Sequence, residues 1–245
     1  MKSISRHKYI AAVASFAALI CVCAKADDIN PVKIGDQAGY VKTADGPLAV
    51  SVDMEDCTFD MQLSKNQHIK YNGPDIIFYD ATQVASDGIL PYLLQAQMSS
   101  GYSWSFKTRG HADLKWFGMM CENKSDFYWS ANKKSLDDQT PETQQIMEDN
   151  SDRCPADFKN GKFSPNKKTK NLIFRPIDNN QWSGFIYGNP SKRDRSTLAY
   201  AGFCLIHNDS VIIGSMYDPD KNLTVPISFL DEISDSLSTL KFTDK

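Results

Sequence analysis

Long apolar segments, clustered histidines and an excess of basic residues are all missing from most of this 245-residue chain. After residue 26 no run is apolar for long enough to cross a bilayer, which takes roughly 20 residues. The formal net charge of −3, with 41% hydrophobic and 23% charged residues, excludes collagen-like, coiled-coil and intrinsically disordered chains. The composition therefore predicts a compact globular protein.

The one long apolar run lies at the start of the chain. It follows Lys2, Arg6 and Lys8, covers residues 9–23 and ends at the small-x-small triplet 24–26. This pattern predicts a secretory signal peptide over residues 1–26, with a membrane anchor as the alternative. We therefore expect a single globular domain over residues 27–245 that is periplasmic or secreted, without stable membrane insertion.

Removal of this leader would make the chain more acidic. It takes away four of the 27 basic residues and none of the 30 acidic ones, which leaves 23 against 30 and a net charge of −7. Nucleic acids and anionic membrane surfaces require a cationic face, so we expect neither as a partner. A protein partner, of basic character, fits this charge better. The densest cationic segment, residues 167–170, is interpreted as a solvated loop.

Four cysteines follow the leader, namely Cys57, Cys121, Cys154 and Cys204. An even number in an exported protein favours two disulfides, whereas a zinc site needs clustered ligands such as Cys-x-x-Cys. Four thiols allow three pairings. We expect Cys121 to pair with Cys154, because the polar segment between them would profit from tethering, which leaves Cys57 with Cys204.

Local patterns predict both strands and helices in residues 27–150. Strands are expected within 47–63, at 76–79 and around 102–107, 114–121 and 126–130. Apolar residues spaced by three and four predict a helix over 88–100. Thr140 as N-cap and Pro141 as the first helical residue predict a short, polar and exposed helix through about Asp149. Strand aromatics are expected in the core rather than on a sugar-stacking platform: Trp104, Trp116, Phe127 and Trp129.

The pattern in the last third of the chain predicts an antiparallel meander followed by a helix. Four strands are expected at 172–177, 182–187, 198–207 and 211–217, with the tightest turn at Asn208-Asp209. One apolar stripe predicts a closing helix across the meander: Phe229, Leu230, Ile233, Leu237 and Leu240. The fold class expected is α+β, a sandwich-like antiparallel meander with helices packed on it.

No motif in the sequence indicates a catalytic centre, a metal site or a bound cofactor, and we expect none of these. His68, His111 and His207 are far apart and form no metal-binding motif. A nucleophile elbow and a phosphate-binding glycine loop are also missing. The segment from Asp218 to Asn222 starts like a calcium loop, but Leu223 replaces the glycine that such a loop needs, so a capping turn is expected.

These observations favour an exported binding or inhibitor protein that acts by surface complementarity, for example an immunity protein against a toxin delivered to the periplasm. Six acidic residues are expected to form the interaction surface: Asp137, Asp138, Glu142, Glu148, Asp149 and Asp152. One alternative is a secreted cell-envelope hydrolase with a carboxylate pair. Another is a small-ligand carrier or envelope-assembly factor with an apolar pocket under the closing helix.

Overall fold

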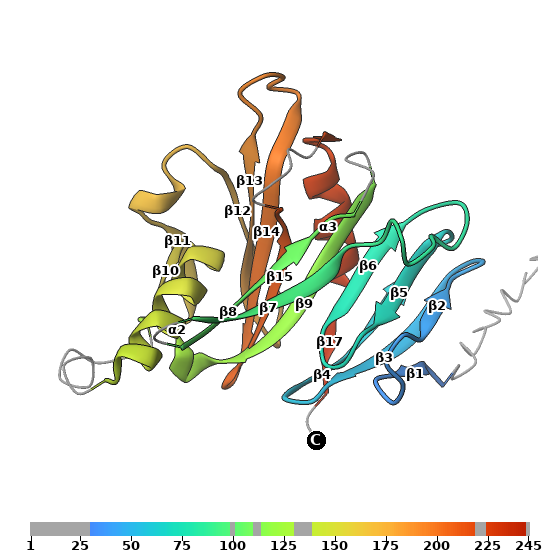
Figure 1. Cartoon of the computed structure of the whole chain (residues 1–245), viewed down its shortest axis with the longest axis horizontal. Coiled ribbons are helices and arrows are strands. Elements are labelled where there is room, and N and C mark those ends of the chain that lie inside the picture. Colours follow the sequence, from blue (N-terminus) through green and yellow to red (C-terminus); the bar gives the residue numbers. More distant parts are fainter. Residues whose placement is uncertain (1–29, 99–100, 110–113, 130–138, 219–223, 244–245) are drawn as a thin grey trace, which may run out of the picture.

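The computed structural model describes residues 30–98, 101–109, 114–129, 139–218 and 224–243 (Figure 1). The predicted signal peptide lies outside these ranges. Within them strands dominate, and two α-helices pack beside the sheets. The expected α+β class holds in this sheet-rich form. No helix of the described ranges is long and apolar enough to span a membrane.

A nine-stranded antiparallel sheet forms the centre of the fold. Its order is β12-β13-β14-β15-β9-β6-β5-β2, and β16 pairs with β14. The predicted meander is confirmed as β12 to β15, and Asn208 adopts the positive φ of 52° that its tight turn requires. The strands are β2 (Val41–Thr43), β5 (Gln67–Tyr71), β6 (Ile76–Asp80), β9 (Lys115–Asn123), β12 (Ile173–Asp178), β13 (Ser183–Pro190), β14 (Thr197–His207), β15 (Ser210–Met216) and β16 (Val225–Pro226).

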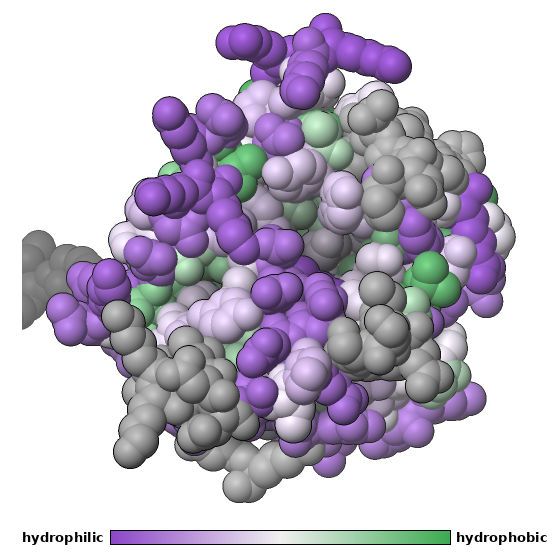
Figure 2. All heavy atoms as spheres, turned by 60° about the vertical axis from the view of Figure 1, so that its left-hand side comes forward, coloured by the Kyte–Doolittle hydropathy of each residue, from purple (hydrophilic) through white to green (hydrophobic). Residues whose placement is uncertain are grey.

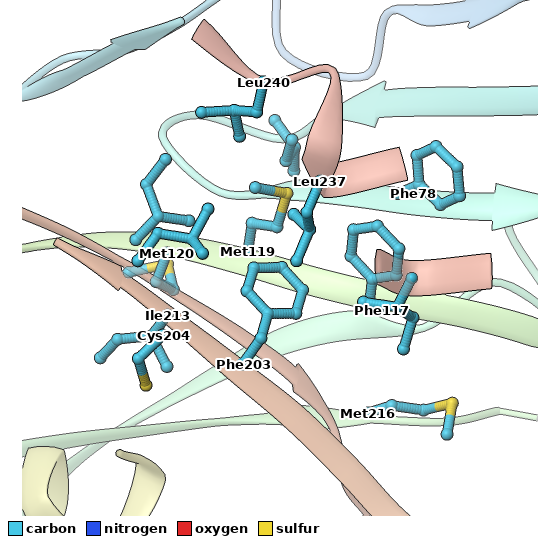
Figure 3. Close-up of a cluster of buried hydrophobic side chains, with 14 of the residues drawn as sticks. Phe78, Phe117, Met119, Met120, Phe203, Cys204, Ile213, Met216, Leu237 and Leu240 are labelled. Atoms are coloured by element: carbon cyan, nitrogen blue, oxygen red, sulfur yellow. The ribbon is translucent and has the colours of Figure 1, made fainter. Parts of the chain in front are cut away.

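One face of this central sheet carries helix α3 and a second sheet. Helix α3 (Phe229–Ser238) is the predicted closing helix, and it contacts β13 and β4. In Figure 3, Phe117 and Phe203 of the central sheet gather with Leu237 of α3, while Cys204 points to the opposite side of its strand. The second sheet has the order β1-β3-β4-β17, with β1 (Val32–Ile34), β3 (Leu48–Met54), β4 (Cys57–Leu63) and β17 (Lys241–Phe242).

The other face of the central sheet is covered by short elements. The ribbon of β7 (Tyr92–Met98) and β8 (Gly101–Lys107) lies across β9, where the Phe106 ring occupies the space that a Cβ on Gly118 would need. Beside it lie η1 (Lys124–Asp126), α2 (Pro141–Arg153), the hairpin β10 (Ala156–Lys159) and β11 (Lys162–Pro165), and η2 (Lys167–Thr169). Helix α2 and the ribbon are seen in front of the central sheet in Figure 1.

Both expected disulfides are present, but the predicted pairing is wrong. The bridges join Cys57 to Cys121 and Cys154 to Cys204. Each one connects a covering layer to the central sheet: the first links β4 to β9, and the second links the end of α2 to β14. Alternate residues of a strand face opposite sides of a sheet, so the two bridges lie on opposite faces. The pairing therefore follows from which elements cover each face of the central sheet. It does not follow from tethering of the polar segment between Cys121 and Cys154.

Three local predictions need correction. Residues 92–98 form strand β7 instead of part of a helix, because Leu93 and Gln95 pair with Phe106 and Trp104 of β8. No strand forms over the described part of 126–130: η1 ends at Asp126 and a turn follows over 127–129, since the Asn123 side chain accepts a hydrogen bond from the Ser125 amide and starts the 3-10 helix, while residue 130 lies outside the described residues. Helix α2 starts after its Thr140 cap as predicted, but it continues to Arg153 and buries Met147 and Asn150.

Candidate functional site

A cavity of 330 Å³ opens between α2, β8 and the β13–β14–β15 segment, and we call it the α2 cavity. Its volume lies at the lower end of the range for small-molecule sites. It is on the face opposite α3, because Tyr187 lines it whereas the neighbouring Gly188 lies against Leu230 of α3. Figure 2 presents this side of the molecule, where hydrophilic side chains predominate and the surface is hollowed between them.

Three tyrosines, two in strands of the central sheet and one directly after β15, form one wall of the α2 cavity. Tyr187 and Tyr200 meet edge to face with ring centroids 6.4 Å apart, and Tyr200 and Tyr217 do so at 5.5 Å. Tyr187 is buried, and its hydroxyl donates to the Arg153 carbonyl at 2.8 Å. Burial raises the pKa of Tyr187 and of Tyr200. Both phenols therefore stay protonated at neutral pH and keep their hydroxyl groups.

Arg153 holds the opposite wall in place. Its Nη2 donates to the Trp104 carbonyl at 2.6 Å and to Ser103 Oγ at 3.1 Å, and its Nη1 donates to Asn150 Oδ1 at 3.0 Å. The guanidinium also lies 4.0 Å from the centroid of the Trp104 ring, a favourable cation–π arrangement. Because most of its donors are satisfied inside the protein, Arg153 acts as a clamp between α2 and β8.

Glu122 supports this wall from behind. Its Oε1 accepts a hydrogen bond of 2.7 Å from the indole Nε1 of Trp104. Burial raises the pKa of the Glu122 carboxyl, while the hydrogen bond from Trp104 and the charge of Arg153 act in the opposite direction. Glu122 thus fixes the orientation of the Trp104 ring, one face of which is covered by Arg153.

Each carboxylate of the α2 cavity has a cation beside it. Asp149 accepts a hydrogen bond from Gln145 at 2.8 Å and lies 3.7 Å from the Arg153 guanidinium. Asp152 forms a hydrogen-bonded ion pair with Lys168 of η2. The cavity is therefore close to electrically neutral, although two of its lining side chains are acidic.

The six acidic residues of the predicted interaction surface fall into three groups. Asp137 and Asp138 lie outside the described residues. Glu142 and Glu148 are exposed on α2, as an interaction surface requires. Asp149 and Asp152 instead line the α2 cavity. Sequence reasoning placed the three tyrosines on strands but did not recognise them as a site, since only the strand register brings them together.

The remaining candidate residues have local partners. His68 is buried, with its ring nitrogens 2.9 Å from Thr43 Oγ1 and 2.8 Å from the Ala81 carbonyl oxygen. His207 Nδ1 lies 2.7 Å from the Gln181 carbonyl, and His111 is outside the described residues. Asp218 is buried and accepts two hydrogen bonds from Thr108, directly after β8, whereas the capping turn expected from Asp218 to Asn222 falls mostly outside the described residues. The described ranges contain no cluster of three potential metal ligands.

The comparisons with known proteins add no functional assignment. No protein-family model, no curated protein and no solved structure matches this chain.

Proposed function

We propose that this protein is an exported binding protein that holds a small polar ligand in the α2 cavity. The observation that carries the proposal is the cavity itself, in which tyrosine rings from β13, β14 and the end of β15 face the polar side chains of α2 and β8. Such a combination of aromatic surface with a few oriented polar groups is typical of small-molecule sites. The two disulfides indicate an oxidising compartment, which supports a periplasmic or secreted location.

This proposal corresponds to the small-ligand carrier that the sequence offered as an alternative. That alternative expected the pocket under the closing helix, whereas the cavity lies beside α2. Inhibition of a protein partner and hydrolysis by a carboxylate pair remain predictions from the sequence. The pairing of Asp149 with Arg153, and of Asp152 with Lys168, suits binding better than acid–base chemistry, because both carboxylates already have cationic partners.

The test is a screen of polar metabolites and sugars by ligand-observed NMR, followed by titration of every hit against variants. Tyr200→Ala and Tyr217→Ala should each weaken binding by about fivefold, since an aromatic contact contributes roughly 1 kcal/mol. Tyr40→Ala is the matched control, because Tyr40 is exposed to a similar degree as Tyr217, 37% against 44%, and lies outside the cavity. Hits that do not respond to either cavity variant, or a screen without hits, would refute the proposal.

A further inference from the structure

The tyrosine rings that line the α2 cavity are steeply inclined to one another. The angle between ring planes is 71° for Tyr187 and Tyr200, and 74° for Tyr200 and Tyr217. Coplanar rings would give a flat platform, on which a planar ligand group stacks. Rings at these angles instead form an angular wall, which suits a compact group that touches more than one ring. Tyr200 is half-buried and Tyr217 is exposed, so both rings can be reached from solvent.

One aromatic ring of this cavity already holds a cation. The Arg153 guanidinium lies 4.0 Å from the centroid of the Trp104 ring, and both residues belong to the cavity lining. The face of an aromatic ring carries partial negative charge and therefore attracts cations. The tyrosine rings of the opposite wall have the same property. Among the described residues, no lysine or arginine lies over any of these three rings, so this property is available to a ligand.

The charged side chains that line the cavity are two carboxylates, Asp149 and Asp152, and one cation, Arg153. Asp149 uses its Oδ1 to accept a hydrogen bond from Gln145. Its Oδ2 lies 3.7 Å from the Arg153 guanidinium, which is longer than an ordinary hydrogen bond. Arg153 is turned towards Trp104 and Ser103 instead. Asp149 Oδ2 can therefore serve a second cation at close range.

The ion pair of Asp152 can give way to a ligand. Its partner Lys168 lies in η2 and is not part of the cavity lining. The two side chains are 72% and 52% exposed, and an ion pair in such an exposed place contributes little to stability. A cationic ligand can therefore replace Lys168 beside Asp152 at small cost. An anionic ligand would instead face two carboxylates that have no way to leave the cavity lining.

We infer that the ligand of the α2 cavity is a small organic ammonium ion, held against the rings of Tyr200 and Tyr217 with Asp149 and Asp152 as counter-charges. This inference rests on the proposed binding function and names its ligand class. It requires that affinity depend on the positive charge of the ligand, on the ring of Tyr217 rather than its hydroxyl group, and on the carboxylates.

The experiment is an NMR titration of the full chain with two pairs of ligands that have the same shape and differ in charge. Choline is compared with dimethylbutanol, the neutral alcohol in which carbon replaces the nitrogen, and ethanolamine is compared in the same way with propanol. The first pair tests a methylated ammonium group and the second a primary one. In at least one pair we expect the cation to bind about tenfold more tightly, a factor within the range of a desolvated cation on an aromatic ring.

Variants of the cavity test the two kinds of contact separately. Tyr217→Ala should weaken binding of the cation by about fivefold, whereas Tyr217→Phe, which keeps the ring, should stay within about twofold of the wild type. Asp149→Asn should lower affinity for the cation by about fivefold and leave affinity for the neutral analogue unchanged. The neutral analogue thus shows whether the cavity of this variant is intact.

Lys168→Gln gives a change in the opposite direction. It removes the cation that competes for Asp152, so affinity for the ammonium ion should rise by about twofold or more. Lys159→Gln is the matched control, because its carboxylate partner Asp157 does not line the α2 cavity.

Three results would overturn the inference: cations that bind no more tightly than their neutral analogues in both pairs, a Tyr217→Phe variant as weak as Tyr217→Ala, or a loss of affinity in Lys168→Gln. If the cations fail while the metabolite screen still yields a neutral ligand that depends on Tyr217, the ammonium inference is wrong and the proposed binding function stands.

Discussion

Arg153 joins helix α2 to strand β8 through a guanidinium that is largely buried, and this makes it the first residue to vary. Arg153→Gln removes the hydrogen bonds to Ser103 and to the Trp104 carbonyl, together with the contact to the Trp104 ring. We expect a loss of about 2–4 kcal/mol in the free energy of unfolding, because Asp149 and the backbone acceptor lose a charged partner in a buried place. Urea denaturation followed by tryptophan fluorescence measures this loss.

A lysine at the same position is expected not to restore stability. Arg153→Lys keeps the charge but lacks the planar fork that reaches several acceptors at once. The control is Lys159→Gln on the exposed end of β10, which should change stability by less than about 0.5 kcal/mol. Full stability of Arg153→Lys would show that charge alone, and not the clamp geometry, holds α2 against β8.

Asp75 gives the clearest pH dependence. It is 3% exposed, and burial raises the pKa of its carboxyl, although the Asn72 amide donates to it at 2.9 Å and Lys70 is near. Because its pKa is higher in the folded state than in the unfolded one, its stabilising contribution is present at low pH and is lost as pH rises through the folded-state value. Asp75→Asn should therefore be more stable than the wild type at neutral pH.

The difference between Asp75→Asn and the wild type should shrink as the solution is made acidic, since the wild-type carboxyl then becomes neutral too. Urea unfolding of both proteins at pH 7.5 and at pH 4 measures it. A difference that is the same at both pH values would mean that burial of the Asp75 charge is not its cause.

At the scale of elements, a sequence pattern predicted the correct element where the local preference of the segment agrees with its pairing and packing in the fold. The strands of the meander have short polar turns and continuous apolar runs, and α3 has one apolar stripe, so each was predictable by itself. Residues 88–100 show the opposite case. Their apolar spacing fits a helix, but pairing with β8 makes 92–98 a strand and leaves Leu94 exposed. No local pattern contains that pairing.

The ribbon β7–β8 depends on one close approach to β9, which can be tested. A Cβ on Gly118 would lie 2.2 Å from the fully buried Phe106 ring, so Gly118→Ala must displace the ribbon. We expect a loss of about 1–3 kcal/mol, the usual cost of overpacking a core. Hydrogen exchange should show that amides of β7 and β8 lose protection before those of β13 and β14 do.

Gly46→Ala is the matched control for this change, because nothing lies within 4 Å of a Cβ at Gly46. It should leave stability and exchange close to those of the wild type. If Gly118→Ala were equally harmless, the ribbon would have to be free to move away from β9, and β8 would then be a poor support for the α2 cavity.

At the scale of the whole molecule, the candidate site was not predictable from the sequence. Its walls come from β8, α2, β13, β14 and the end of β15, so residues as far apart in the sequence as Ser103 and Tyr217 line one cavity. The sequence did indicate that all four cysteines are bridged, since their number and the leader favour disulfides. Their partners depend on which layer covers which face of the central sheet, and that information is not local.

The two disulfides allow stability to be separated from the candidate function. Their sequence separations are 64 and 50 residues, so chain entropy gives nearly equal stabilisation, about 4 kcal/mol each. Removal of either bridge, by Cys57→Ala with Cys121→Ala or by Cys154→Ala with Cys204→Ala, should therefore cost a similar amount in urea denaturation. Mass mapping of peptides under non-reducing conditions checks the connectivity first.

Their effects on binding should differ, because only one bridge adjoins the α2 cavity. Cys204 Sγ lies 3.7 Å from the Arg153 carbonyl that also accepts the Tyr187 hydroxyl. Loss of the Cys154–Cys204 bridge frees the end of α2 next to the cavity, so ligand affinity should fall by about tenfold or more under conditions where both variants remain folded. Loss of the Cys57–Cys121 bridge acts on the opposite face of the sheet and should leave affinity unchanged. An equal loss in both variants would mean that binding follows overall stability and that the α2 cavity is not the site.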